Sequence, residues 1–436
     1  MNNRTITVID ETIREGMQYR GVVFSREQRE KILGFQEQLG VDICQAGYVP
    51  AHITEQENIR YLNQVVKQKG YKIIVAAMGR ASIYDVDALV NSGISDFHLH
   101  AHIKEKVDNV EIEKSLQKIR AAVEEIRKRV DNATISIAVL DIGSSSPELL
   151  ERVSLFLVNA LCIDILSLPD TSGIMSPDSF YDTVKKITLS TKTEAKVPNF
   201  IRTDPLKHIL STDTLKHVTQ FSVHCHNDLG MASANTVMGV KAGASAVEVS
   251  ALGIGERNGI GDMFTVLKIL KNQGYNFRLN IEDIKAFREY YYYVSDICKN
   301  QTGEPLFNYN TPFFGNGVRT HVAGTHAGSE FGLFPQKDNI NYNDFIREKD
   351  SRIYNECINK KDSKKIDDCK KEEYFINVLC GKQLVKKYLD SIDIEYLPEQ
   401  LHNITEQIKS KSAELGSSLT KNDVIAIVKN YCEARV

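Results

Sequence analysis

The chain has 436 residues, of which 25% are charged, and its formal net charge at pH 7 is −3. This balance, with lysine and arginine spread along the chain, excludes the basic surface of a typical nucleic-acid-binding protein. No apolar run approaches the roughly 18 residues that a membrane-spanning helix needs. The eight cysteines form no CxxC pair, and no apolar signal region precedes the first expected strand. We therefore expect a cytoplasmic protein with reduced thiols and without nucleic-acid or membrane partners.

Short β-branched or apolar runs recur along the first two thirds of the chain, with helical periodicity between them. Eight strand–helix alternations predict parallel strands joined by crossover helices, which is an α/β fold. The count favours a closed (β/α)8 TIM barrel over an open doubly wound sheet, which usually has fewer strands. The expected strands span residues 6–10, 42–46, 72–78, 96–102, 134–140, 163–168, 220–226 and 246–250.

Two helix starts support this division. Ser25 and Gln28 form a capping-box pattern before an apolar-periodic helix that ends at Leu39. Ser176 is followed by Pro177, which predicts an N-cap with proline at the first helical position.

The pattern changes after residue 274. A tyrosine-rich helix is expected over 281–299, followed by a Gly/Asn/Pro-rich loop, a charged run over 347–373, and helices over 399–415 and 420–433. We predict a TIM-barrel catalytic domain over residues 1–278. A linker and lid-like subdomain over 279–345 and a mainly helical C-terminal subdomain over 346–436 would follow it.

Residues 224–230 read HCHNDLG, the most informative motif of the chain. Because strand side chains alternate with a period of two, His224 and His226 share one face and Cys225 points to the other. Both imidazoles end an expected strand and precede a helical stretch. They therefore emerge at the carboxyl end of the barrel, where barrel enzymes keep their chemistry.

The segment DETIREG, residues 10–16, follows the first expected strand. In a barrel, Glu15 or Asp10 could meet His224 and His226 at one ion. Two neutral imidazoles and one carboxylate make a divalent-metal site with open positions, which suit a bidentate oxygen ligand such as a 2-oxo acid. Arg14 could neutralise the oxyanion that forms when the keto group is attacked. The alternative for Arg14 is a salt bridge to Glu15 or Asp10.

Several segments together resemble the DRE-TIM metallolyase superfamily, in its branch of homocitrate synthases and isopropylmalate synthases. They read DETIREGMQ (10–18), PDTSG (169–173), HCHNDLG (224–230) and GIGERNG (253–259), and THVAGTH (320–326) resembles the lid segment of that branch. The resemblance covers residues 5–330. It implies a TIM barrel, a homodimer, and a divalent metal that is Mg²⁺, Mn²⁺ or Zn²⁺.

The resemblance also implies roles for individual residues. Glu15, His224 and His226 would hold the metal, and Arg14 would stabilise the oxyanion. The lid residue His326 would be the base that makes the acyl-CoA enolate, with His321 supporting it, and Glu256 of GIGERNG joins the catalytic candidates. Thr171 would bind the carboxylate of the oxo acid. The substrate-binding candidates are Gln18, Arg80, His98, Ser144 and Thr171, although Arg80 could instead form a surface ion pair.

Three departures from the family concern the substrate and the ligand set. Homocitrate synthases carry an arginine and a serine after the fifth strand, which bind the distal carboxylate of 2-oxoglutarate. This chain reads VLDIGSSS over 139–146, which argues against that substrate. Ile260 stands where isopropylmalate synthases often place an asparagine ligand, so three protein ligands are expected. His100 and His102 match no family position, and water-exposed or hydrogen-bonded histidines at the mouth remain an alternative for them.

The resemblance implies an acyltransferase that condenses an acyl-CoA co-substrate, such as acetyl-CoA, with a 2-oxo acid to give a 2-hydroxy di- or tricarboxylic acid. One alternative is a retro-Claisen or aldol-type carbon–carbon lyase. Lyases of the hydroxymethylglutaryl-CoA type usually carry a cysteine in the loop over 253–261, and this loop has none. Another alternative is a non-catalytic metal-binding homologue.

Overall fold

The structure is a computed structural model that describes residues 4–103, 109–139, 141–193, 219–315, 320–321 and 373–433. The chain divides into two compact units, Met1–Phe307 and Asn308–Val436. Among the described residues, none of the helices combines the length and the apolar character that crossing a bilayer requires.

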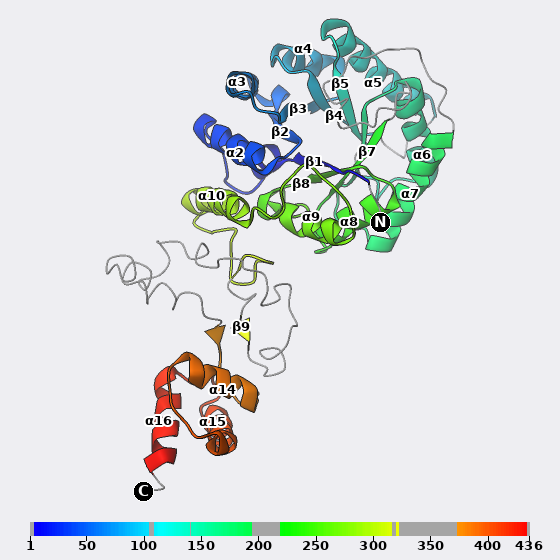
Figure 1. Ribbon diagram of the computed structural model, residues 1–436. Helices are drawn as coiled ribbons and strands as arrows, with labels where there is room; N and C mark the ends of the chain where they lie inside the picture. The colour runs from blue at the N-terminus through cyan, green and yellow to red at the C-terminus, as the bar shows by residue number, and fades with distance from the viewer. Residues whose placement is uncertain are drawn as a thin grey trace. The chain divides into compact units, whose positions relative to one another are not determined.

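The first unit is a closed barrel of eight parallel strands in chain order, in which β1 pairs with both β2 and β8 (Figure 1). The predicted (β/α)8 fold is therefore confirmed, and each predicted strand agrees with an observed one to within two residues at either end. The strands are β1 (Thr7–Asp10), β2 (Ile43–Tyr48), β3 (Ile74–Arg80), β4 (Asp96–Ala101), β5 (Thr134–Val139), β6 (Ile165–Asp170), β7 (Gln220–Cys225) and β8 (Ala246–Val249).

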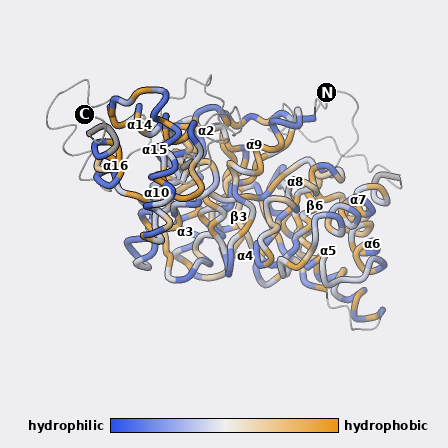
Figure 2. Tube along the Cα trace, turned by 90° about the horizontal axis from the view of Figure 1, so that it is seen from below, coloured by the Kyte–Doolittle hydropathy of each residue, from blue (hydrophilic) through white to orange (hydrophobic). Residues whose placement is uncertain are grey.

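Helices surround the strands, and blue and orange segments alternate along them as expected for helices that bury one face (Figure 2). The helices are α1 (Thr12–Gly16), α2 (Arg26–Leu39), α3 (Ile53–Lys69), α4 (Ile83–Asn91), α5 (Asn109–Arg129), α6 (Pro147–Leu155), α7 (Pro177–Thr193), α8 (Ala232–Ala242), α9 (Met263–Asn272) and α10 (Ile284–Thr302). The capping box of Ser25 and Gln28 is present at the start of α2. Ser176 accepts a hydrogen bond from the Ser179 backbone at the start of α7, so both predicted helix starts are confirmed.

Side chains along each strand alternate between the barrel interior and the helix layer. The interior contains a buried apolar layer made of Ile9, Ile43, Ala76, Ile165 and Ala246. Two residues further along β1, β2 and β8, alternation places Glu11, Gln45 and Glu248 on the same inward side. The carboxyl end of the barrel therefore carries polar side chains directly above an apolar floor.

Helix α10 is held on the barrel by two buried tyrosines. The Tyr290 hydroxyl donates a hydrogen bond to Asp10 Oδ2 at 2.7 Å, and the Tyr291 hydroxyl donates to Asp262 Oδ1 at 2.8 Å. Because Asp10 ends β1 and Asp262 is the N-cap of α9, the helix braces the chain at two points around the barrel mouth.

The second unit has its own apolar core. Helices α14 (Lys382–Ser391), α15 (Leu401–Leu415) and α16 (Lys421–Glu433) follow a short parallel pair of β9 (Thr320–His321) and β10 (Glu373–Tyr374). Its buried core includes Ile376, Leu384, Leu389, Ile404, Ile408 and Val424. A helical C-terminal region is thus present, while the predicted bounds at residues 278 and 345 and the lid-like role stay predictions.

Candidate metal centre and active site

Strand β7 brings the two predicted imidazole ligands together. His224 and His226 are buried, and their Nε2 atoms lie 3.2 Å apart. Cys225 is buried on the opposite face, where it contacts Thr236 of α8, as the alternation predicted. Two imidazole nitrogens this close can share one ion.

Both imidazoles are uncharged near neutral pH. Burial lowers the pKa of His224, and burial together with the neighbouring His224 lowers the pKa of His226 to about 4. A neutral imidazole is the form that binds a metal, so no proton has to leave these rings first.

Glu15 supplies the carboxylate of the site. It lies in α1, directly after β1, and its ligand atom is within 4.8 Å of those of His224 and Glu11. Burial alone would raise the pKa of Glu15, but the positive charge of Arg14, helped by the hydrogen bond from the Glu256 backbone, holds it below its usual value. Glu15 is therefore a carboxylate at neutral pH, and its chemistry with the two imidazoles fits a divalent ion.

Asp10, the alternative carboxylate, faces the other way. Its Oδ1 accepts hydrogen bonds from the backbone and hydroxyl of Thr12 at 2.8 and 2.6 Å, and its Oδ2 accepts from Tyr290. The Thr12 hydroxyl in turn accepts from the Ala251 backbone at 2.8 Å. Asp10 thus fixes the turn that carries Arg14 and Glu15 instead of reaching the mouth.

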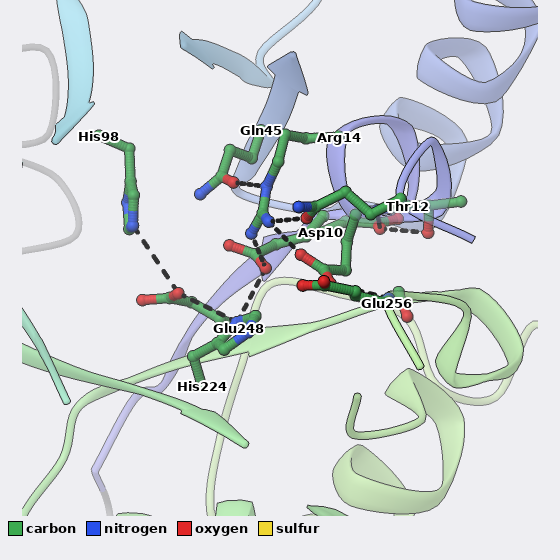
Figure 3. A network of polar contacts seen from close by, with 12 residues as sticks. Asp10, Thr12, Arg14, Gln45, His98, His224, Glu248 and Glu256 are labelled. Atoms are coloured by element: carbon green, nitrogen blue, oxygen red, sulfur yellow. Dashed lines mark hydrogen bonds and ion pairs between the residues drawn. The ribbon is translucent and has the colours of Figure 1, made fainter. Parts of the chain in front are cut away.

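Arg14 is the hub of the polar network in Figure 3. Its Nε donates to Gln45 and its Nη1 donates to Glu15 and, at 2.8 Å, to Gln18. Its Nη2 donates to Glu11 at 2.6 Å. These contacts occupy four of the five guanidinium N–H groups. One N–H of Nη2 has no acceptor among the described residues and can serve an oxyanion.

Another buried acid, Glu248, lies beside the residues that contact Arg14. Glu248 is the direct partner of His224 in the β7–β8 register, and its carboxylate accepts a hydrogen bond from Ser222. Glu248 Oε2 lies 3.9 Å from His98 Nε2, and the His98 Nδ1 lies 3.1 Å from the Ser136 hydroxyl. The predicted substrate-binding residue His98 is thus placed at the inner wall of the site (Figure 3).

The loops after β6, β7 and β8 are tied together by Arg257. Its guanidinium donates to both carboxylate oxygens of Asp228, at 2.9 and 3.0 Å, and to the Thr171 carbonyl at 2.6 Å. The Thr171 hydroxyl accepts from the Asp141 backbone at 2.9 Å. The hydroxyl hydrogen of Thr171 has no acceptor among the described residues, so it can donate to a bound carboxylate.

The loop after β8 closes tightly on itself. A Cβ on Gly259, whose φ is +85°, would lie 2.0 Å from the Gly253 carbonyl oxygen, so only glycine fits. The Ile260 backbone donates to that oxygen at 2.9 Å, and the Gly259 carbonyl accepts from Asn227 at 3.0 Å. The loop also donates a hydrogen bond from the Glu256 backbone to Glu15 Oε1 at 3.0 Å, which fixes the carboxylate.

The comparison with protein families agrees with this geometry. The family described as HMGL-like matches residues 5–199 and 204–290, which is more than half of the chain. The chain belongs to the HMGL-like family. The superfamily expected from the motifs is thereby confirmed.

Curated relatives match this HMGL-like chain over most of its length. The 2-isopropylmalate synthase of Sulfurisphaera tokodaii is 30% identical over 75% of this chain and 76% of its own. The homocitrate synthase of Pyrococcus abyssi is 30% identical over 74% of this chain and 79% of its own. A probable 2-isopropylmalate synthase of Methanosarcina acetivorans is 28% identical over 98% of this chain and 72% of its own.

Solved structures agree with the HMGL-like barrel at the level of the fold. The HMG-CoA lyase from Brucella melitensis has a TM-score of 0.50 at 14% identity and covers 67% of this chain and 99% of its own. The hydroxymethylglutaryl-CoA lyase from Pseudomonas aeruginosa has a TM-score of 0.50 at 14% identity, over 69% and 94%.

Some predicted site residues lie apart from the cluster around Arg14. Arg80 is 57% exposed and forms an ion pair with buried Asp85 at 2.6 Å, which is the alternative that the sequence left open. Ser144 is exposed, and the Glu256 carboxylate is half-exposed and lies 3.6 Å from Arg257. The structure describes only the backbone pairing of His321, in the second unit, and His326 lies outside the described residues.

The two additional histidines, one in β4 and one directly after it, have different surroundings. His100 is half-buried, its ring lies 5.9 Å from that of Tyr48, and burial lowers its pKa to about 4. His102 follows the strand and is exposed.

Sequence reasoning missed four residues that shape the site, which are Glu11, Gln45, Glu248 and Arg257. Alternation could have found the first three, because each lies two residues beyond an inward-facing apolar residue of its strand. Arg257 could not be assigned, because its partners come from loops that only the closed barrel brings together.

Proposed function

We propose that this protein is a metal-dependent acyltransferase that condenses an acyl-CoA, with acetyl-CoA as our first choice, with a 2-oxo acid. The observation that carries this proposal is the convergence of the His224 and His226 Nε2 atoms beside Glu15 and Arg14 at the barrel mouth. The names of the relatives, 2-isopropylmalate synthase and homocitrate synthase, support the same reaction class.

Glu15, His224 and His226 would hold the divalent ion, which we take to be Mg²⁺, Mn²⁺ or Zn²⁺. When bound, this ion supplies a Lewis acid for the keto group of the oxo acid. The Thr171 hydroxyl would orient the carboxylate of the oxo acid, and the Arg14 Nη2–H would donate to the keto oxygen as it gains negative charge. Gln18 and His98 would lie next to the bound oxo acid, with Arg80, Ser144 and Glu256 placed further out.

The reaction needs a base that removes a proton from the acyl-CoA methyl group, and we assign this role to His326 with the support of His321. The resulting carbanion forms a bond to the keto carbon, and the alkoxide that results takes up a proton. Water then hydrolyses the thioester, which releases free CoA thiol and a 2-hydroxy di- or tricarboxylic acid.

Thiol release tests this function directly. Purified protein with Mg²⁺, Mn²⁺ or Zn²⁺ is incubated with acetyl-CoA and a panel of linear, branched and dicarboxylic 2-oxo acids. Release that depends on one oxo acid, and that is lost in Arg14→Gln, supports the synthase. Formation of an acyl-CoA or an oxo acid from a hydroxy acid would point to the lyase. A protein that binds the metal but shows no turnover would point to the non-catalytic homologue.

We also propose a cytoplasmic homodimer. The resemblance to the synthase branch supports the homodimer. Cysteines such as Cys44 and Cys225, which are free and buried, support the cytoplasmic location. Light scattering on the purified full chain tests the dimer.

A further inference from the structure

Glu11 is a buried carboxylate that the ligand set above does not use. It lies on the inward face of the barrel, two residues beyond Ile9, and is completely inaccessible to solvent. Its Oε2 lies 2.6 Å from Arg14 Nη2 and 2.9 Å from His224 Nδ1. One carboxylate thus touches both the proposed oxyanion-stabilising arginine and a proposed metal ligand.

Among the described residues, His224 Nδ1 and the other carboxylate oxygen of Glu11, Oε1, lack a hydrogen bond of good geometry, although both atoms are buried and the two side chains lie next to each other. Buried polar groups are almost always paired, because leaving them unpaired costs about 1–3 kcal/mol. A small rotation of the imidazole ring would pair Nδ1–H with the Glu11 carboxylate.

The tautomer of His224 decides whether it can be a ligand. If Nδ1 carries the proton, Nε2 offers its lone pair to the ion; if Nε2 carries it, the ligand is lost. A carboxylate at Nδ1 selects the first form and makes the imidazole a stronger donor to the metal. Glu248, whose Oε2 lies 3.5 Å from the same Nδ1, borders the ring from β8.

We propose, on the basis of the function proposed above, that Glu11 is a positioning residue that accepts the Nδ1–H of His224 and holds Arg14 beside the metal. It orients the ligand and the guanidinium together, so that both face the same substrate oxygen. The residue acts through His224 and Arg14 and does not touch the substrate.

A second metal ion is the competing role for Glu11, because its ligand atom lies within 4.8 Å of those of His98 and Glu248. Charge argues against it. Glu11, Glu15 and Glu248 carry at most three negative charges and Arg14 carries one positive charge, so a single divalent ion is enough to balance the site. A second dication would also lie against the Arg14 guanidinium, which is bonded to the same Glu11 carboxylate.

The test compares Glu11→Gln with the wild-type full chain. Metal-free protein is titrated with Mn²⁺ in a calorimeter, and turnover is measured separately. We expect one ion per chain, a Kd for Mn²⁺ that rises roughly 10- to 100-fold in the variant, and a fall in kcat that exceeds the change in KM for acetyl-CoA. Asp42→Asn is the matched control, because Asp42 is also buried and paired with an arginine, Arg278, but lies directly before β2, at the opposite end of the strand from the site. Its Kd should stay within about twofold of the wild-type value.

Equal Kd values for Glu11→Gln and wild type would overturn this role, as would two Mn²⁺ ions per chain. If Glu11→Gln does not fold, ¹⁵N-histidine NMR on the wild-type protein shows which ring nitrogen of His224 carries the proton. The His224→Asn variant identifies the signals of this residue. A proton on His224 Nδ1 is expected, and a proton on Nε2 would contradict the role. Failure of the wild type to bind metal or release thiol would count against the proposed function instead, so the two failures are distinguishable.

Discussion

Removing one hydroxyl from α10 should measurably weaken the barrel. In Tyr290→Phe, the ring keeps its place and its stacking on Phe35, whose centroid lies 5.6 Å away, so no cavity is created. The 2.7 Å hydrogen bond that the hydroxyl donates to Asp10 Oδ2 is lost, together with the longer one, at 3.4 Å, that it accepts from Gln36 Nε2. The substitution therefore isolates the contribution of this hydroxyl, in which the short bond to Asp10 is the dominant part.

The expected cost follows from the burial of both partners. Asp10 and Tyr290 are inaccessible to solvent, so water cannot replace the lost donor. Burial raises the pKa of Asp10, and the hydrogen bonds from Thr12 and Tyr290 work against that rise. A hydrogen bond to a charged group contributes about 1.5–3 kcal/mol. We expect the free energy of unfolding to fall by about 2 kcal/mol.

Urea unfolding followed by circular dichroism measures this change, since the chain has no tryptophan for fluorescence. Tyr293→Phe is the control, because Tyr293 is partly exposed and its hydroxyl has no hydrogen bond to a described residue. A loss below about 0.5 kcal/mol in Tyr290→Phe, equal to that of Tyr293→Phe, would refute the idea that α10 braces the β1 turn.

Three further predictions concern the site and its surroundings. A Cβ on Gly255 would lie 2.7 Å from Glu15 Cγ, so Gly255→Ala should weaken Mn²⁺ binding on the order of tenfold by calorimetry. Gly34→Ala in α2, where a Cβ meets no atom within 4 Å, should leave binding unchanged and stabilise the fold by about 0.5–1 kcal/mol. Burial lowers the pKa of His100 from 6.5 to about 4, so the unfolded chain binds more protons in that window and stability falls as the pH drops through it. His100→Gln should reduce the slope of unfolding free energy against pH there by up to about 1.4 kcal/mol per pH unit; an unchanged slope would show that His100 titrates normally. Dialysis against a chelator should lower the melting temperature and added Mn²⁺ restore it, whereas Glu15→Gln should show no response to the ion.

Local sequence patterns predicted the barrel well because its strands and helices each carry a periodic signal. The alternation in β7 placed both histidines on one face, and the cap at Ser25 set the start of α2. The surroundings of Arg14 were harder to predict. Its contact with Gln45 joins residues 31 positions apart, and that of Tyr290 with Asp10 spans 280 positions. Such pairs depend on how the barrel closes and which helix covers β1, which no local pattern contains.

The ion pair of Arg80, by contrast, joins residues that are close in the sequence. Asp85 lies five residues further along, in the first turn of α4, and takes the Arg80 guanidinium at the outer edge of the mouth. An acidic residue in the first turn of the following helix is a signal that a single sequence does contain. Contact between Arg80 and substrate therefore stays a prediction, and it would require this ion pair to open.

The closed base of the loop after β8 limits how the protein could evolve. Gly253 and Gly259 are in contact at the base of this loop, so the length of the loop between them is fixed. An inserted residue would have to break this contact. The backbone amide of Glu256 in the same loop donates a hydrogen bond to Glu15, so a longer loop would weaken metal binding before it changed substrate specificity. New substrate preferences should therefore arise through insertions elsewhere around the rim, where length can vary without penalty to the ion.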